Sequence, residues 1–265
     1  MLAITNILVP IVFSWNCAWA ARYAARLAKE FGSQIVFLHV SQDPNGNTLE
    51  DFVSKEVGAG GHRSVVVGGD PADRIIDLAR EYSADLIVMP TYHGRFRTFL
   101  IGSVTAKVLH DVECPVLTGI HHYDRPPQVP ESFRTIVCAV ADAPGCVPLF
   151  RWAHDFAARV GARVRVVHAM PAVDEVSENC GEIDIRRYLT TQARDNFSAR
   201  FAAESDPPPV ELHGGEVGTV IREAALVDQA DLVVIGRGHA DRALGRLRTH
   251  SYSIIRNAPC PVISV

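Results

Sequence analysis

The sequence ADLIVM at residues 84–89 returns as ADLVVI at residues 230–235. In both segments, four apolar residues follow the aspartate without the polar alternation of a half-exposed strand. Such runs are typical of parallel strands that are covered on both faces. The two segments therefore predict one buried parallel strand that occurs twice in the chain.

The repeat extends outward from these segments over most of the 265 residues. A shift of 146 also aligns Cys114-Pro115-Val116 with Cys260-Pro261-Val262, while a shift of 129 aligns Ile7-Leu8-Val9 with Ile136-Val137-Cys138. The second half therefore has 17 extra residues in its middle. One period this long indicates a duplicated domain, not a solenoid. We predict a first copy at 1–122, a second copy at 133–265 and a stiff, proline-rich linker at 123–132.

Apolar runs alternate with helical patterns in both copies, which predicts two doubly wound α/β domains with five-stranded parallel sheets. The 17 extra residues allow a full helix in the second copy, where the first copy has a short helical piece at 49–57. The expected strands are 6–11, 34–40, 64–67, 86–89, 116–119, 135–140, 163–168, 209–212, 232–235 and 262–265. The other expected helices are 16–31, 71–82, 102–111, 147–160, 183–204, 218–227 and 251–257.

Composition excludes several classes of protein. Lys and Arg number 26 against 30 Asp and Glu, so the net charge of −4 gives no reason to expect nucleic acid or an anionic membrane as a partner. Residues 1–6 lack the basic start of a signal peptide, and the longest apolar runs are far shorter than a membrane span. Six cysteines without CxxC spacing indicate reduced thiols. We therefore expect a soluble, cytoplasmic protein.

The ligand crevice of an open α/β sheet lies beyond the carboxyl ends of its strands. Gly102-Ser103-Val104-Thr105 begins a predicted helix there, and helix N–H groups beside hydroxyls suit a phosphate. Spacing alone favours a second interpretation, in which Ser103 caps the helix. The chain has no GxxxxGK[ST] loop and no complete GxGxxG.

Several motifs together resemble the universal stress protein family in its tandem, two-domain form. They are ILVP at 7–10, GGDPADRIIDLA at 68–79, GSVTAKVLHDVECPVL at 102–117, GGEVGTVIREAA at 214–225, ADLVVIGRGH at 230–239 and NAPCPVISV at 257–265. The resemblance implies a Rossmann-like, adenine nucleotide hydrolase-like fold for each copy. It also implies that the copies pair as an intramolecular pseudo-dimer, with 116–119 and 262–265 near the pseudo-twofold axis. Whether two whole chains also form a homodimer is left open by the sequence.

Members of this family that bind ATP carry an aspartate after the first strand and a G-x2-G-x9-G-[ST] stretch after the fourth. This chain has Val12 and Ala141 at the aspartate position, with Asp142 one place later. The first copy replaces the first glycine with Pro90, and the second copy has Arg248 in place of the glycine before the hydroxyl residue. The nucleotide motif is therefore degenerate in both copies, and neither a cofactor nor a metal is assigned. If ATP with magnesium binds, the resemblance implies a site in the first copy formed by Val40, Gly94, Gly102, Ser103, Val104 and Thr105.

Cysteines and histidines at repeated positions give further alternatives. Cys17 and Cys146 each begin the first helix of their copy, where a helix N-terminus lowers a thiol pKa, so either a redox sensor or plain packing fits them. His39 and His168 follow apolar strands, and we expect hydrogen-bonded structural histidines there.

Loop residues offer three weaker signals. His93 and His239 fall where a phosphate would lie, while the neighbours His121 and His122 lack the spaced ligands of a metal site. An arginine cluster could bind an anion or a protein partner, or it could belong to a solvated loop. It comprises Arg237, Arg242, Arg246 and Arg248.

No nucleophile–base pair and no carboxylate pair stands out, so we do not expect an enzyme beyond slow ATP hydrolysis. The leading interpretation is a cytoplasmic stress-response protein that acts by binding a ligand or an unidentified protein partner. ATP binding by the first copy and thiol redox sensing through Cys17 and Cys146 are the alternatives.

Overall fold

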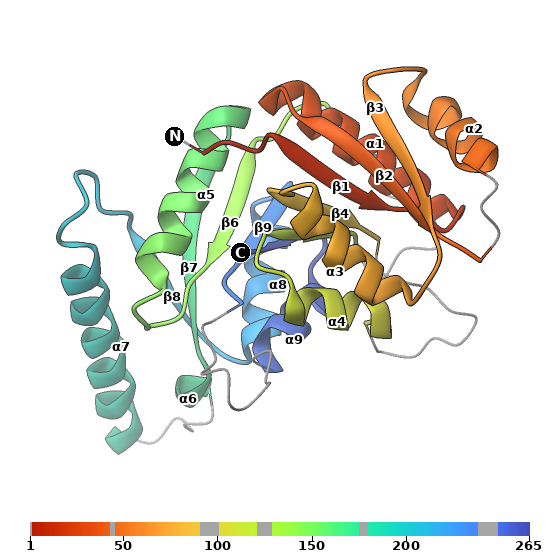
Figure 1. Ribbon diagram of the computed structural model, residues 1–265. Helices are drawn as coiled ribbons and strands as arrows, with labels where there is room; N and C mark the ends of the chain where they lie inside the picture. Colours follow the sequence, from red (N-terminus) through yellow and green to blue (C-terminus); the bar gives the residue numbers. More distant parts are fainter. Residues whose placement is uncertain (1, 43–45, 91–100, 121–128, 175–179, 238–248) are drawn as a thin grey trace. The chain divides into compact units, whose positions relative to one another are not determined.

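The computed structural model describes the chain except for residues 1, 43–45, 91–100, 121–128, 175–179 and 238–248 (Figure 1). The chain forms two compact units. One comprises Met1–Glu131 together with Pro261–Val265, and the other comprises Ser132–Cys260. The last five residues, which the repeat assigns to the second copy, therefore lie with the first unit.

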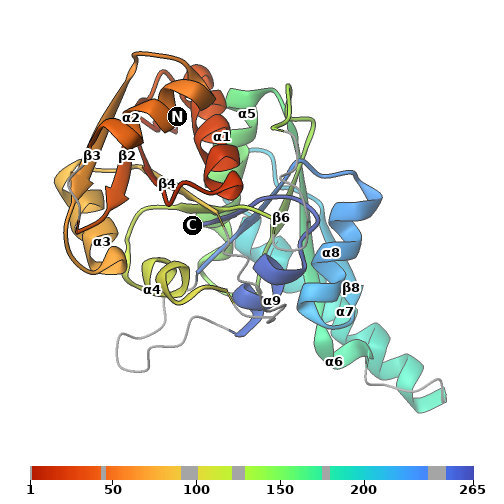
Figure 2. The same cartoon turned by 90° about the vertical axis from the view of Figure 1, so that its right-hand side faces the viewer.

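The first unit contains a sheet in the order β3-β2-β1-β4-β5, with every pairing parallel. The strands are β1 Asn6–Pro10, β2 Gln34–Val40, β3 His62–Val67, β4 Leu86–Met89 and β5 Val116–Thr118. Helices α1 (Trp15–Phe31) and α2 (Gly46–Val57) contact each other, as do α3 (Pro71–Glu81) and α4 (Ser103–Asp111). Figure 2 shows these two helix pairs on opposite faces of the sheet, which is the doubly wound arrangement.

A short terminal strand completes this sheet. Strand β10 (Val262–Ser264) runs antiparallel to β5 and pairs Ile263 with Leu117. All three of its residues are buried. The edge of β5 is therefore covered by the last residues of the chain.

The second unit has the parallel order β9-β6-β7-β8. Its strands are β6 Thr135–Ala139, β7 Arg163–Met170, β8 Val210–Gly214 and β9 Leu232–Ile235, and its helices are α5 Cys146–Val160, α6 Pro171–Asp174, α7 Cys180–Phe201, α8 Val217–Val227 and α9 Thr249–Asn257. The 22-residue α7 confirms the full helix expected from the extra residues, while the one-turn α6 was not predicted. The predicted α/β fold class is confirmed.

The two copies end their first helix with the same backbone conformation. Gly32 and Gly161 end α1 and α5 in the left-handed region, each with φ of 73°. Both donate their N–H groups to the helical carbonyl four residues earlier. Glycine adopts this conformation without steric cost, so each copy stops its first helix by the same device.

The aspartate of the ADLIVM segment fastens strands together. Asp85 Oδ2 accepts hydrogen bonds from the N–H groups of Thr5 (2.7 Å) and Asn6 (3.0 Å) and from the Thr5 hydroxyl (2.6 Å). Asp231 Oδ2 accepts from the N–H groups of Arg134 (2.6 Å) and Thr135 (3.1 Å). The repeated aspartate therefore anchors the start of the first strand in each unit.

Candidate functional site

The β1–α1 loop, residues 11–14, lies at the carboxyl end of β1 in the first unit. Val12 is exposed at the position where the ATP-binding pattern has aspartate, and its N–H donates to Cys17 Sγ at 3.3 Å. Phe13 adopts a left-handed conformation with φ of 52°, and its ring lies 4.4 Å from the His39 ring and 5.6 Å from that of Phe52. The loop thus carries apolar side chains at the position where the ATP-binding pattern has a carboxylate.

The start of α4 differs from the expectation of a serine cap. Gly102 is the N-cap residue and supplies no side-chain hydrogen bond, while Ser103 is the exposed first residue of the helix. The prediction that Ser103 caps this helix is therefore wrong, because the helix begins at Ser103 itself, one residue earlier than that role requires. Its first-turn N–H groups lack a capping side chain, which is the geometry that favours an anion.

The structure describes five of the six residues predicted for the nucleotide site. Val40 ends β2 and is half-buried, Val104 is half-buried and Thr105 is buried. Gly94 lies outside the described residues, as do His93, His239 and the arginines at 242, 246 and 248.

The Gly-Gly-acid turns after β3 and β8 serve the fold. Asp70 Oδ1 accepts from the N–H groups of Ala72 and Asp73, both at 3.1 Å, and so caps α3. Glu216 caps α8 by accepting from the Thr219 N–H at 2.8 Å. These carboxylates are engaged with helix N-termini, which leaves them little capacity for a ligand.

In the second unit, helix α7 covers the β6–α5 loop. Asp142 accepts hydrogen bonds from Arg200 Nε at 2.5 Å and from Asn196 Nδ2 at 2.7 Å. Partial burial raises the pKa of Asp142, but the bonds from Arg200 and Asn196 outweigh it and hold that pKa below its ordinary value. The Phe197 ring lies 5.0 Å from that of His168. The carboxylate nearest the family's aspartate position is therefore engaged by its own chain.

The two repeated histidines form the same hydrogen bond. His39 Nδ1 lies 2.9 Å from the Ile11 carbonyl oxygen, and His168 Nδ1 lies 2.9 Å from that of Val140. Because a carbonyl oxygen can only accept, both rings carry a proton on Nδ1. This confirms the interpretation of hydrogen-bonded structural histidines.

The repeated cysteines are buried inside their units. Cys17 is fully buried, and Cys146 is 3% exposed. Burial raises the pKa of Cys146, and it raises that of its neighbour Cys138 to about 12. Reactive thiols need exposure and a lowered pKa, so these surroundings favour the packing interpretation.

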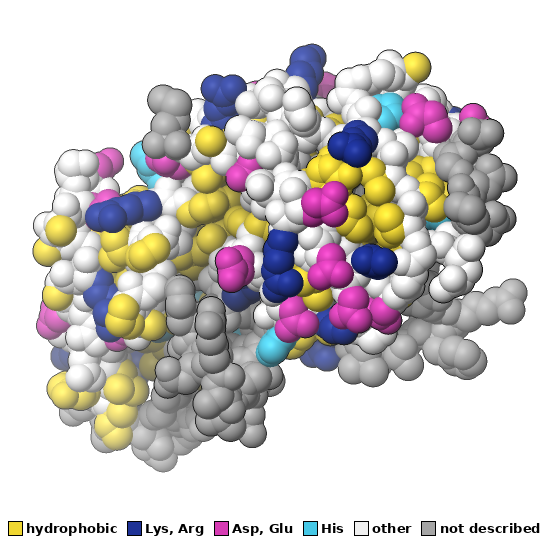
Figure 3. All heavy atoms as spheres, viewed as in Figure 1, with side chains coloured by type: hydrophobic (Ala, Val, Ile, Leu, Met, Phe, Trp, Pro, Cys, Tyr) yellow, Lys and Arg dark blue, Asp and Glu magenta, His cyan; other side chains and the backbone are white. Residues whose placement is uncertain are grey.

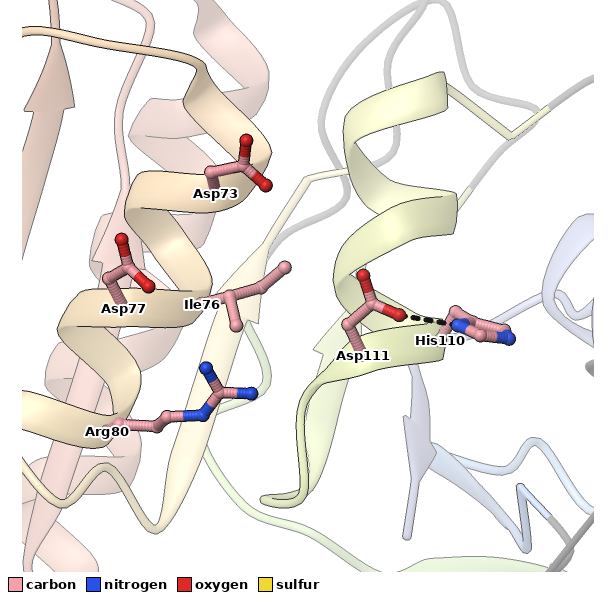
Figure 4. Close-up of a pocket in the computed structure, with 6 residues that line it drawn as sticks. All are labelled: Asp73, Ile76, Asp77, Arg80, His110 and Asp111. Carbon is pink, nitrogen blue, oxygen red and sulfur yellow. Dashed lines mark hydrogen bonds and ion pairs between the residues drawn. The ribbon is translucent and has the colours of Figure 1, made fainter. Parts of the chain in front are cut away.

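An open groove of about 630 Å³ runs between α3 and α4 (Figure 4). Asp73, Ile76, Asp77 and Arg80 line it from α3, and His110 and Asp111 line it from α4. It contains none of the predicted nucleotide-site residues. Among the described residues, no group of three or more acidic, histidine or cysteine side chains is placed to hold a metal ion.

These observations define a duplicated, doubly wound α/β protein. The profile described as "Universal stress protein family" matches residues 53–118 and 132–265, which is more than half of the chain. The chain therefore belongs to the universal stress protein family, and the recognition from sequence is confirmed.

Two relatives are similar to parts of this chain. A universal stress protein of Methanothermobacter thermautotrophicus is 43% identical over 54 residues, which cover 20% of this chain and 37% of the relative. A universal stress protein of Thermus aquaticus, encoded in the 3′ region of a QAH/OAS sulfhydrylase, is 32% identical over 111 residues, or 40% of this chain and 78% of the relative. The chain thus spans little more than a third of the archaeal relative.

Two solved structures resemble the whole chain. A functionally unknown protein of Pseudomonas aeruginosa has a TM-score of 0.73 at 17% identity, covering 99% of this chain and 92% of its own. A universal stress protein of Archaeoglobus fulgidus has a TM-score of 0.65 at 20% identity, covering 98% and 95%. At these identities the likeness establishes the fold alone. Within the described residues, no helix combines the length and apolar character needed to span a bilayer.

Proposed function

We propose that this universal stress protein acts in a cytoplasmic stress response by binding, not by catalysis, and that its first copy is the ligand-binding copy. The candidate ligand is an adenine nucleotide with magnesium. The observation that carries the proposal is the start of α4, where Gly102 leaves the helix N-terminus without a side-chain cap.

The chemistry of this helix start supports phosphate binding. Unpaired N–H groups and the positive end of the helix dipole attract anions, and the exposed Ser103 hydroxyl adds a donor. Val40 is half-buried at the carboxyl end of β2, and we place the adenine beside its backbone. A carboxylate is missing at Val12, so we expect weaker binding than in members with the complete motif.

Two features of the second copy argue against a nucleotide site there. Asp142 is held by Arg200 and Asn196 of α7, and Arg248 stands where close backbone approach to a phosphate requires glycine. We therefore propose at most one nucleotide site per chain.

Calorimetric titration with ATP and magnesium tests this proposal directly. The expected result is one site per chain. Two equivalent sites would contradict the assignment to the first copy, and no binding heat at any protein concentration would contradict the nucleotide site altogether.

A matched pair of variants locates the site. Gly102→Asp supplies a good N-cap and so keeps the helix, but its carboxylate repels phosphate, and we expect ATP affinity to fall at least about tenfold. Arg248→Asp makes the corresponding change in the second copy and should leave affinity unchanged. An equal loss from both variants would argue against a site at α4.

A further inference from the structure

One histidine of the first unit is buried with both of its ring nitrogens beside hydrogen-bond acceptors. The side chain of His62, the first residue of β3, is only 3% exposed. Its Nδ1 lies 3.2 Å from the Gly60 carbonyl oxygen, and its Nε2 lies 3.1 Å from Oε1 of Glu50 on α2. A carbonyl oxygen only accepts hydrogen bonds, and so does an ionised carboxylate. Both bonds therefore form together only when the ring carries a proton on each nitrogen.

The carboxyl group of Glu50 is kept ionised by its hydrogen bonds. Its Oε2 accepts from the Ser64 hydroxyl of β3 at 2.6 Å, and its Oε1 accepts from the Ser54 hydroxyl at 3.3 Å. The bond from Ser64 is the largest cause that holds the pKa of Glu50 below its ordinary value, and the bond from His62 adds to it, while slight burial acts in the opposite direction. The imidazole therefore faces an anion at neutral pH.

The other groups around this contact are uncharged or engaged with different partners. The Phe37 ring of β2 lies 5.3 Å from the imidazole, edge to face. The guanidinium of Arg63 lies over a tyrosine ring at 5.0 Å, and Arg22 of α1 pairs with Glu56 of α2 at 3.7 Å. Figure 3 shows a histidine next to acidic side chains where α2 meets β3. In the part of the chain that the structure describes, Glu50 is thus the charged partner of the imidazole.

The contact is a feature of the first copy. Val66 and Leu212 lie opposite the repeated histidines in the two sheets, so the strand registers align His62 with Pro208. Proline carries no titratable group. Any effect of this histidine on the packing of a helix is therefore confined to α2.

We propose that the ion pair between His62 and Glu50 makes the packing of α2 on β3 dependent on pH. The pair holds α2 while the imidazole carries both protons, and α2 loosens as pH rises and the ring loses one of them. Histidine is the side chain that ordinarily changes its charge between pH 5 and 8. Below about pH 4 the carboxylate also takes up a proton, so the ion pair is complete only at mildly acidic pH.

Loosening of α2 also reaches the β1–α1 loop. The Phe52 ring, two residues after Glu50, lies 5.6 Å from the Phe13 ring of that loop. An effect of pH on nucleotide binding through this contact rests on the proposed function, whereas the ion pair itself does not. Experiments without nucleotide test the ion pair alone, so its failure and the failure of the nucleotide site are distinguishable.

Nitrogen-15 NMR of the histidine rings in the full chain measures the ion pair directly. Comparison with His62→Gln assigns the ring signals. At pH 6 both ring nitrogens of His62 should carry a proton. In Glu50→Gln, which retains an oxygen for the serine hydroxyls, the pH at which half of the rings are neutral should fall by about 1. A His62 ring that is neutral at pH 6, or a titration that Glu50→Gln leaves unchanged, would overturn the proposal.

Hydrogen exchange of α2 measures the packing. After correction for the intrinsic effect of pH, exchange in residues 49–57 of the wild type should become at least about tenfold faster between pH 6 and pH 8.5, because a hydrogen bond to a charged group is lost. His62→Gln keeps a polar side chain and should remove this pH dependence. His154→Gln changes an exposed histidine of α5 in the second unit, and as the matched control it should retain the dependence. Exchange of α2 that is independent of pH in the wild type, or equally dependent on pH in His62→Gln, would contradict the proposed role.

Discussion

Asp85 shows how much one side chain contributes to joining the strands of the first unit. Burial raises the pKa of its carboxyl, but the hydrogen bonds from the Thr5 hydroxyl and from the N–H groups of Thr5 and Asn6 outweigh this and lower it. A carboxyl with a lowered folded pKa stabilises the protein above its unfolded pKa of about 3.9, and that stability is lost as pH falls through the folded value.

We therefore predict that Asp85→Asn lowers the free energy of unfolding by about 1–3 kcal/mol at pH 7, because the amide nitrogen faces backbone donors. The loss should shrink as pH falls below about 4, since the wild-type carboxylate then also takes up a proton. Urea denaturation at several pH values measures both effects. A loss that is independent of pH would mean that the ionised carboxylate is not what fastens β1.

We predict that the thiols of Cys17 and Cys146 react slowly in the native protein. Because both are buried and burial raises the pKa of Cys146, a thiol reagent should label them far more slowly in the native protein than in the urea-unfolded chain. Mass spectrometry of labelled peptides reads each site separately. Faster labelling in the native protein than in the unfolded chain would support the redox-sensor alternative.

Gly218 of α8 lies close against side chains of α9 in the second unit. A Cβ atom at Gly218 of α8 would lie 2.1 Å from Ser253 Oγ and 2.9 Å from Asn257 Nδ2 of α9. We predict that Gly218→Ala destabilises the protein by about 1–3 kcal/mol, although alanine is the better helix former.

Adding Ser253→Gly removes the opposing side chain and should restore part of this loss in thermal unfolding. The first copy supplies a natural comparison, since its matching position is Ala72. Equal stability of Gly218→Ala and the wild type would show that α8 and α9 can separate without cost.

Helix α7 is held to the β6–α5 loop by the hydrogen bond from Arg200 to Asp142. Arg200→Ala removes the main partner of that carboxylate, so hydrogen exchange in the second half of α7 should become faster at pH 7. Because the pKa of Asp142 is lowered, the bond to Arg200 is present above about pH 4 and weakens as pH falls through the folded value. Arg194→Ala, an exposed position on the same helix, is the control and should leave exchange unchanged.

The order of elements could be predicted from sequence because fully buried parallel strands read as continuous apolar runs. Strands β2, β4 and β9 have the bounds that those runs indicate. Strand β3 begins at His62, two residues before the expected start, because its first residues are polar and join the sheet through pairing with β2.

The site could be predicted only in part. The Gly102–Thr105 segment lies at a helix start as expected, but which residue caps the helix depends on backbone geometry that spacing does not encode. The hydrogen bond between Asp142 and Arg200 joins residues 58 positions apart, so it cannot be predicted from a local sequence pattern. Burial of Cys17 and Cys146 likewise depends on packing.

For the molecule as a whole, the terminal strand β10 ties the last residues to the first unit. Removing residues 261–265 would bare the edge of β5 and delete the buried Val262 and Ile263, and we predict a loss of at least about 3 kcal/mol from the first unit. The chain has three tryptophans, so a Trp152→Phe background leaves Trp15 and Trp19 as reporters of the first unit alone. Urea unfolding followed by their fluorescence measures the loss. An unchanged midpoint would show that β10 is dispensable.

The β5–β10 pairing also sets an order of events during synthesis. Domains generally fold as they emerge, amino-terminal first, and β5 is translated 144 residues before the strand that covers it. The nascent first unit therefore carries an open strand edge throughout translation of the second copy. Its sheet gains β10 only after residues 262–264 have been translated and have left the ribosome.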